Sequence, residues 1–276
     1  MKTTLQHKSV GRQLAAIFTI AAFLLIHGTA FCQESTTDIA KKLSNPVASL
    51  ISVPLEDNYL TGVGPLKGYQ NTLDIEPVIP FTFTKNWNLI TRVVLPVVTQ
   101  TNVSALPGRQ SGLSDAVVSA FLSPSKTSGG LIWGAGPAFL IPTATNNYLA
   151  TKKWGVGPTA AVLYQQAGWT YGMLVNQIWS YAGSNNRDNV SQFYALPFIT
   201  YNFPTGAGLS MTGDVTRDWK HHYTDAVVTP AVSGLTRIGK QVFQLQAGPM
   251  IPISAAPGEK PDFGVRTKIT FVFPRK

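Results

Sequence analysis

The sequence has few charged residues, a single cysteine and, beyond its first 30 residues, no long apolar run. Charged residues make up 13% of the chain, whereas a soluble globular domain carries roughly 25%. The chain therefore has too little charge to cover an ordinary aqueous surface. A helical membrane protein would need runs of about 20 apolar residues, and the chain beyond residue 30 offers none, which excludes that class too.

The other features that the sequence lacks limit the ligands and reactions that the protein can support. Cys32 is the only cysteine, so a disulfide within the chain and a cysteine-based metal cluster are both excluded. The net charge is +9, but the basic residues form no run and no basic helix, and we expect no nucleic-acid partner. The glycine-rich stretches at 134–137 and 155–158 are followed by no helical pattern, which a phosphate-binding fingerprint requires. We expect no cofactor, no metal and no catalytic residues.

The one apolar run that is present lies near the N-terminus. Residues 1–13 are polar and basic, and Leu14 to Ile26 are almost entirely apolar. Small residues follow at Gly28 and Ala30, which is the pattern of a secretory signal peptide. We assign residues 1–30 to a signal peptide cleaved after Ala30, with cleavage at Cys32 as the alternative. A retained N-terminal anchor is the competing interpretation.

Export can be tested directly. The mature protein is expected to begin at Phe31 or Gln33, because signal peptidase cuts after small residues that follow a short apolar run. N-terminal sequencing of protein extracted from membranes would decide this. A start at Met1 would contradict the signal-peptide assignment.

Residues 31–46 form a polar segment that we expect in the periplasm. Asp38 is placed to cap a short helix through Ile39 and Leu43, and Asn45-Pro46 would end it. From Val47 onward, strand-like runs alternate with clusters of Gly, Pro, Asn and Ser. The pattern predicts twelve strands, at 47–62, 70–83, 87–100, 112–123, 131–142, 154–166, 169–182, 190–203, 209–219, 226–237, 242–253 and 262–273.

The last of these runs shows most clearly which surroundings the strands require. Phe263, Val265, Thr267, Ile269, Phe271 and Phe273 share one face, and Gly264, Arg266, Lys268 and Thr270 share the other. Side chains alternate across a strand, so the first face suits lipid and the second suits water. A soluble sandwich would bury the apolar face instead. Aromatic residues near the strand ends favour the membrane, where they form girdles: Trp87, Trp154, Trp169, Trp179, Trp219, Tyr59, Tyr181 and Tyr201.

The connections between strands point to the same architecture. Residues 84–86, 167–168 and 239–240 form tight turns, whereas 101–111, 143–153 and 254–261 are longer. Outer-membrane barrels have short turns on the periplasmic side and long loops outside. The fold class is therefore all-β: residues 47–276 form a closed antiparallel transmembrane barrel of about 12 strands. It would lie in the outer membrane of a Gram-negative bacterium.

Prolines inside the strands would interrupt the regular ladder of hydrogen bonds between strands, because each removes a backbone donor. We expect local bulges at seven of them: Pro77, Pro96, Pro137, Pro158, Pro197, Pro230 and Pro249.

Several motifs resemble one family. They include Asn45-Pro46-Val-Ala-Ser-Leu, Trp87-Asn-Leu-Ile-Thr-Arg92, Gly130-Leu-Ile-Trp-Gly-Ala-Gly-Pro137, Lys153-Trp-Gly-Val-Gly-Pro158 and Phe271-Val-Phe-Pro274. The chain resembles the bacterial outer-membrane transporter-like proteins grouped with the meta-pathway of phenol degradation, which are often mislabelled neuromedin U. The resemblance extends through nearly all of the mature chain. It implies an outer-membrane barrel that passes small solutes, aromatic compounds among them, and it brings no catalytic residues.

Charged side chains are predicted to meet inside the barrel. Glu56 should face Glu76 across the first hairpin, with Asp74 one step away, and all three point inward. Carboxylates crowded among low-dielectric walls repel one another and need cations. Inward-facing basic residues stand on the strands that flank this hairpin once the barrel closes, namely Arg92, Arg266 and Lys268. We predict that these six residues form a charge cluster that narrows the lumen. Separate solvated charges are the alternative.

A second lumen feature is a wall of small residues. Five glycines share the inward face of three neighbouring strands: Gly134, Gly136, Gly155, Gly157 and Gly172. They either relieve crowding between strands or leave a seat for a ligand or for residues 33–46. Other inward positions are polar or small, among them Ser52, Asn58, Ser119, Asn176, Ser180, Thr200, Asn202, Ser210, Thr212, Gln244 and Gln246.

The function predicted from these features is passive passage of small solutes through a narrow polar lumen. The partners expected are a small-molecule solute, outer-membrane lipids and lipopolysaccharide, and the barrel-assembly machinery. Two other classes stay open. One is a barrel enzyme acting on lipid, with His221 or His222 as general base. The other is a structural or adhesive surface barrel whose long loops carry the function.

Overall fold

The computed structural model describes residues 36–103, 108–126, 129–239 and 241–273. The proposed signal peptide 1–30, both cleavage positions and the first residues of the segment 31–46 lie outside this range. The expected short helix is present as α2, which spans Thr36–Leu43. It begins two residues before Asp38, so Asp38 lies in its first turn and is not its cap. No helix in the described range is long and apolar enough to cross a membrane.

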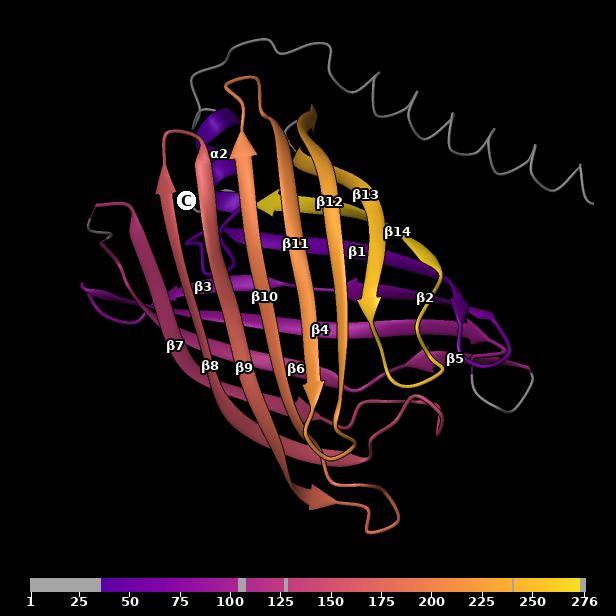
Figure 1. Cartoon of the computed structure of the whole chain (residues 1–276). Coiled ribbons are helices and arrows are strands. Elements are labelled where there is room, and N and C mark those ends of the chain that lie inside the picture. Colours follow the sequence, from indigo (N-terminus) through magenta and orange to yellow (C-terminus); the bar gives the residue numbers. More distant parts are fainter. Residues whose placement is uncertain (1–35, 104–107, 127–128, 240, 274–276) are drawn as a thin grey trace, which may run out of the picture. The chain divides into compact units, whose positions relative to one another are not determined.

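The described residues form one antiparallel sheet that closes on itself (Figure 1). Its elements are β1 (Ile51–Val63), β2 (Gly68–Ile75), β3 (Val78–Thr82), β4 (Trp87–Thr101), β5 (Arg109–Leu113), β6 (Ala116–Pro124), β7 (Leu131–Ile141), β8 (Lys153–Gln166), β9 (Trp169–Gly183), β10 (Ser191–Asn202), β11 (Ala207–Asp218), β12 (Tyr223–Ile238), β13 (Gln241–Ser254) and β14 (Phe263–Phe273). β14 pairs with β1 from Ile51↔Phe273 to Thr61↔Phe263, which closes the ring.

The fourteen strands occupy twelve positions around the barrel wall within the described range, and we call each position a stave. Two staves are each broken into two strands. β2 and β3 both pair with β4 and are two parts of one stave, interrupted at Glu76–Pro77. β5 and β6 pair with the other edge of β4 and are interrupted at Ser114–Asp115. Counting each broken stave once confirms the closed antiparallel barrel of twelve strands. The predicted strand positions agree with these staves to within a few residues, apart from the start of the first.

The two ends of the barrel differ. Segments 167–168 and 203–206 join strands at one end, which also holds the last residue of β12, the first of β13, the first of β1 and the last of β14. Segments 142–152, 184–190 and 255–262 join strands at the other end. We call these the short-turn end and the long-loop end. In Figure 1 the short-turn end, with α2 among the strand ends, is at the top.

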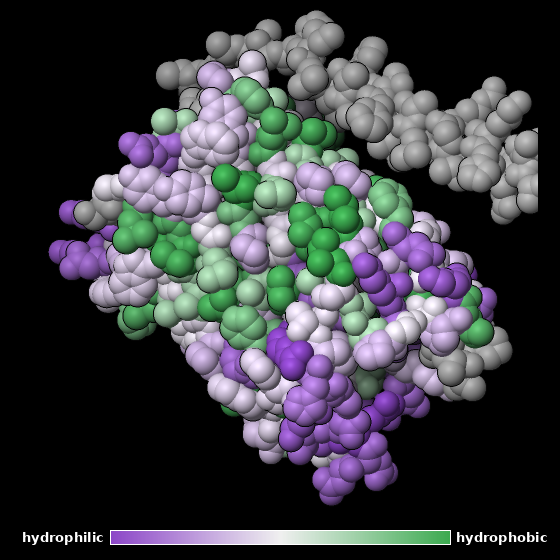
Figure 2. Space-filling view, viewed as in Figure 1, coloured by the Kyte–Doolittle hydropathy of each residue, from purple (hydrophilic) through white to green (hydrophobic). Residues whose placement is uncertain are grey.

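The outer wall is apolar and carries aromatic residues near both ends. Val162, Met211, Val232, Ile251 and Ile269 are large apolar side chains exposed on it. Exposed aromatic residues stand near its two ends: Phe83, Trp133, Trp169 and Tyr171 at the short-turn end, and Trp154, Trp179, Tyr181 and Trp219 at the long-loop end. Figure 2 shows the apolar surface across the strands and hydrophilic residues gathered at the long-loop end. An apolar band between two aromatic girdles matches the surface that a barrel presents to lipid.

The expected bulges are absent at most of the seven prolines. Pro77 lies at a break in a strand, and Pro96 lies opposite the break at Ser114–Asp115, across which the pairing with β4 shifts by one residue. The other register shifts lie at Gly62, Trp154/Gly155 and Ala226/Val227. Pro197 stays opposite Met173 of β9, while the pairing with β11 passes from Ala195 to Phe198 at constant register. Each N–H in a strand points to a single neighbour, so a proline there loses one hydrogen bond without displacing the strand.

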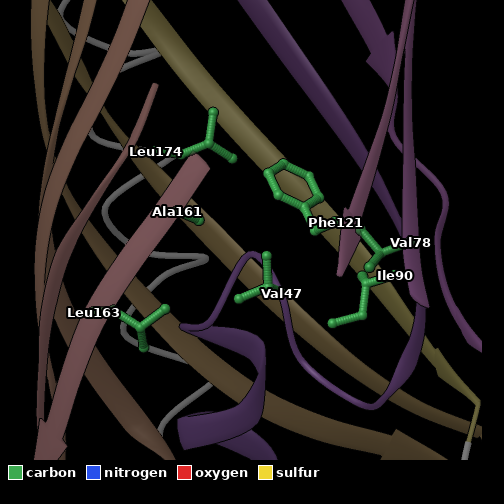
Figure 3. Close-up of a cluster of buried hydrophobic side chains, with 7 residues drawn as sticks. All are labelled: Val47, Val78, Ile90, Phe121, Ala161, Leu163 and Leu174. Carbon is green, nitrogen blue, oxygen red and sulfur yellow. The ribbon is translucent and has the colours of Figure 1, made fainter. Parts of the chain in front are cut away.

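Residues 47–50 lie in the lumen instead of starting the first strand. Val47 is 2% exposed and packs among inward-facing side chains of the wall, including Phe121, Leu163 and Leu174 (Figure 3). Ala48 and Leu50 form a second buried cluster with Ile39 of α2 and with wall residues of β13 and β14. Burial of these apolar side chains contributes more than a few additional ladder bonds at the barrel edge would.

Hydrogen bonds attach α2 and the residue that follows it to the barrel wall. Gln165 of β8 donates from Nε2 to the carbonyl oxygen of Lys41 at 2.7 Å. Asn202 of β10 donates from Nδ2 to Ser44 Oγ at 3.1 Å. The described part of the predicted periplasmic segment therefore lies inside the short-turn end of the barrel. We call residues 36–50 the lumen segment.

Candidate functional site

The structure brings the inward-facing charges of the first and last strands into direct contact. Glu56 of β1 lies opposite Lys268 of β14, and their Oε2 and Nζ atoms are 2.6 Å apart. Arg266, two residues away on β14, places Nε 3.0 Å from Glu56 Oε1. Glu56 and Arg266 are each 7% exposed. We call the pairing of β1 with β14 the seam of the barrel. At the seam, one carboxylate contacts two cations.

The partners on the first hairpin differ from the prediction. Glu56 lies opposite Asp74, not Glu76. The bulge at Gly62, where φ is +70°, and the turn that follows it change the count across the hairpin. Glu76 instead contacts Arg92 of β4, with Oε1 2.9 Å from Nη2. All six predicted charges line one cavity, in two ion-paired groups and with Asp74 between them.

Three further residues complete the cluster. Arg266 Nη1 lies 3.0 Å from Asp214 Oδ2 of β11, three strands away along the wall. The hydroxyl of Tyr194 on β10 donates to Asp214 Oδ1 at 2.9 Å. Asn58 accepts from Arg266 Nε at 2.6 Å and donates to Asp74 Oδ2 at 3.1 Å. Alternation along β11 placed Ser210 and Thr212 inward and could have placed Asp214 there too. The reach of Arg266 to Asp214 across three strands had no signal in the sequence.

Three of these charged residues, Glu76, Arg92 and Lys268, stand between two cavities inside the barrel. The larger has a volume of about 360 Å³ and the smaller about 160 Å³. Both are lined by Glu76, Arg92, Leu196, Thr212 and Lys268, so these residues form the boundary between the two. The smaller cavity is bounded by Leu43 to Pro46 of the lumen segment. The two cavities, which we call the larger and the smaller chamber, therefore adjoin at a layer that holds charged side chains, and we call this layer the charged constriction.

The larger chamber has two unlike walls. Its charged residues come mainly from β1, β2, β11 and β14, whereas Val117, Leu140 and Ile178 come from β6, β7 and β9. Val94, Val190 and Leu196 add to the apolar side. A chamber of this kind can hold an amphipathic molecule with its polar group toward the charges. The smaller chamber is mixed as well, with Ser52, Thr200 and Gln244 beside Val78 and Phe198 in its lining.

The five glycines of the predicted small-residue wall lie on the inward face of β7, β8 and β9, alternating with exposed residues such as Trp133 and Trp154. A Cβ atom on Gly136 would lie 2.0 Å from the carbonyl oxygen of Ala120, and one on Gly172 would lie 2.3 Å from that of Val162. At Gly134 and Gly155 a Cβ atom would meet inward side chains of neighbouring strands at 3.2 and 2.7 Å. These contacts favour relief of crowding between strands over a ligand seat.

One of these glycines can be tested by a single substitution. A Cβ atom on Gly157 would lie 1.7 Å from the carbonyl oxygen of Gln177, so Gly157→Ala must displace backbone. We expect it to lower the free energy of unfolding by about 1–3 kcal/mol, measured by urea unfolding of refolded protein in lipid vesicles. Gly234→Ala is the matched control, because nothing lies within 4 Å of its added Cβ. Equal stability of the two variants would contradict the close packing of β8 and β9.

His221 and His222 lie in the turn after β11, away from the chambers. His221 Nδ1 is 2.8 Å from Asp218 Oδ2, and its Nε2 is 3.4 Å from Asp188 Oδ2. The hydrogen bond to Asp218 raises the pKa of His221. In the described part of the chain no serine hydroxyl bonds to this ring, as a hydrolytic pair would require. Nor do the described residues include a group of three side chains able to hold a metal ion.

A closed twelve-stranded antiparallel barrel with an apolar outer wall and a charged lumen is a transmembrane β-barrel of the outer-membrane type. The chain belongs to the family described as "Putative MetA-pathway of phenol degradation", whose model matches residues 58–227. No curated protein matches the sequence at a significant level.

Solved structures resemble the fold. An outer membrane channel from Pseudomonas putida F1 matches with a TM-score of 0.65 at 16% identity, covering 83% of this chain and 98% of that one. Outer membrane phospholipase A from Escherichia coli matches with a TM-score of 0.48 at 11% identity, covering 87% of this chain and 99% of that one. The second score is too low to support a functional comparison.

Proposed function

We propose that this protein is an outer-membrane channel for the passive passage of small solutes, aromatic compounds among them. The observation that carries the proposal is the pair of adjoining chambers inside the barrel, which meet at ion-paired side chains. Family membership and the channel from Pseudomonas putida F1 with the same fold support it. The apolar side of the larger chamber suits an aromatic ring, and the polar constriction suits a small size limit.

The protein would be inserted in the outer membrane by the barrel-assembly machinery after signal-peptide cleavage. Its exposed aromatic residues at both ends would contact lipids, and lipopolysaccharide would contact the long-loop end. Flux through the barrel would follow the concentration gradient.

Conductance of the refolded protein in planar bilayers tests the proposal. We expect small, discrete steps, because a twelve-stranded barrel is narrow and the lumen segment occupies part of it. Liposome swelling with solutes of increasing size should show a low size limit. Bilayers and liposomes that stay impermeable would contradict transport and favour a structural or adhesive barrel.

Hydrolysis of lipid by purified protein, lost in His222→Ala, would instead favour an enzyme. The exposed carboxylate contacts of His221 give that alternative no support.

A further inference from the structure

The charged groups that line the larger chamber do not balance. Among the described residues that line it there are four carboxylates and three basic side chains. The carboxylates are Glu56, Asp74, Glu76 and Asp214, and the basic residues are Arg92, Arg266 and Lys268. The chamber therefore has an excess of one negative charge when all seven groups are ionised.

The excess is located on one residue. Glu56, Glu76 and Asp214 each have a basic group within 3.0 Å. Asp74 has no basic group within 4.0 Å in the described part of the chain, and its hydrogen-bond partner is the neutral amide of Asn58, at 3.1 Å. Its charge is thus left for something else to balance.

The surroundings of Asp74 increase its need for a cation. It lies directly opposite Glu56 in the β1–β2 pairing and two residues from Glu76 on the same face of its stave. Carboxylates at facing positions, or two residues apart on one face of a strand, repel strongly inside a low-dielectric wall. Asp74 lines the larger chamber and is absent from the lining of the smaller one, so a balancing cation would sit in the larger chamber.

The apolar side of the same chamber indicates what kind of cation fits. Leu140, Ile178 and Val190 line it together with the charges. A hydrated metal ion would gain nothing from that apolar surface, whereas a hydrocarbon body buried against it is stabilised. A volume of about 360 Å³ admits a single ring or a short chain.

We propose that the larger chamber is a binding site for small organic monocations, with the ammonium group on Asp74 and the hydrocarbon body against Leu140 and Ile178. This inference deepens the proposed channel function, because it names the solute class that the chamber selects. The ammonium group supplies hydrogen bonds to the carboxylate, and the charges of the chamber then sum to zero.

Binding of three molecules of similar shape tests the proposal: benzylammonium, benzyl alcohol and benzoate. Full-length protein in detergent micelles is dialysed against each at neutral pH and moderate salt. We expect benzylammonium to bind about tenfold or more tightly than benzyl alcohol, because a hydrogen bond to a charged group is worth more than a neutral one. Benzoate should bind most weakly of the three.

Asp74→Asn should abolish the preference for benzylammonium. Asp57→Asn is the matched control, because Asp57 is the neighbouring carboxylate that accepts a hydrogen bond from Asn71 at 2.7 Å and is not part of the chamber lining. Micelle partitioning is the same for all three proteins and cancels in the comparison. Equal binding of benzylammonium and benzyl alcohol by the wild type, as a protonated Asp74 would produce, overturns the proposal. So does a preference that survives in Asp74→Asn.

Liposome flux separates this inference from the proposed function. Flux of small solutes without any preference for benzylammonium would keep the channel and overturn the cation site. A binding preference that depends on Asp74, in liposomes impermeable to all three probes, would keep the cation site and contradict the channel.

Discussion

Glu56→Gln is expected to lower the free energy of unfolding by roughly 3–5 kcal/mol, because it removes the buried charge that Arg266, itself buried, and the partly buried Lys268 share. Glu56 Oε2 lies 2.6 Å from Lys268 Nζ, and Oε1 lies 3.0 Å from Arg266 Nε. With a neutral amide in that place, Lys268 loses its carboxylate partner and Arg266 keeps only Asp214. Urea unfolding in lipid vesicles, followed by tryptophan fluorescence, measures the change.

Lys67→Ala is the control for this substitution. It breaks the salt bridge between Lys67 and Asp262, whose side chains are 65% and 63% exposed. Exposed pairs contribute about 0–1 kcal/mol, so this variant should unfold almost as the wild type does. If Glu56→Gln were no less stable than Lys67→Ala, the seam cluster would not stabilise barrel closure.

The same substitution is expected to change ion selectivity. Removing the carboxylate of Glu56 from the larger chamber leaves Lys268 of the constriction without its partner and makes the lumen more positive, so the preference for cations over anions should fall. Arg92→Ala, which removes a cation from the boundary between the chambers, should shift selectivity the opposite way. Reversal potentials in a salt gradient measure both. Unchanged selectivity in both variants would show that the cluster does not lie on the ion path.

Deletion of residues 33–46 is expected to raise single-channel conductance several-fold. Leu43 to Pro46 bound the smaller chamber, and α2 occupies the short-turn end of the barrel. Without them this chamber opens directly to the solution, and the charged constriction becomes the main resistance. Planar-bilayer recordings of the deletion variant beside the wild type give the measurement.

Two further variants make this test specific. Gln165→Ala combined with Asn202→Ala removes two side-chain donors that bond to the lumen segment, and should give intermittent openings of the larger conductance. Lys41→Ala keeps the helix backbone and the carbonyl that accepts from Gln165, so its conductance should match the wild type. A deletion variant with unchanged conductance would contradict obstruction by the lumen segment.

The local pattern of residues determined the strands and their faces. Alternation placed Glu56, Arg92, Arg266 and Lys268 inward, and the structure has all four there. This works because the side-chain period of a strand is a property of the backbone itself. Closure of the last strand on the first also followed, since an apolar stave with an open edge has no partner for its backbone in lipid.

Tertiary structure decided which inward residues meet. The Gly62 bulge and the turn beside it together changed the partner of Glu56 from Glu76 to Asp74, and a count of residues across a turn contains no information about a bulge. The pair of Arg266 with Asp214 depends on how the staves are staggered around the ring, which residues far apart in the chain set together.

The lumen segment also differs between what the local sequence predicts and what the tertiary structure decides. Residues 47–50 read as the start of a strand, because Val47, Ala48 and Leu50 are apolar and follow a proline. In the folded barrel the inward side chains of Phe121, Leu163 and Leu174 form an apolar surface that none of those strands has alone. The pattern of residues along the chain thus predicted a twelve-stranded barrel and placed six charged residues on the inner side of its wall. Only the closed barrel decided the charge partners and the position of residues 47–50, because both depend on surfaces that exist only after closure.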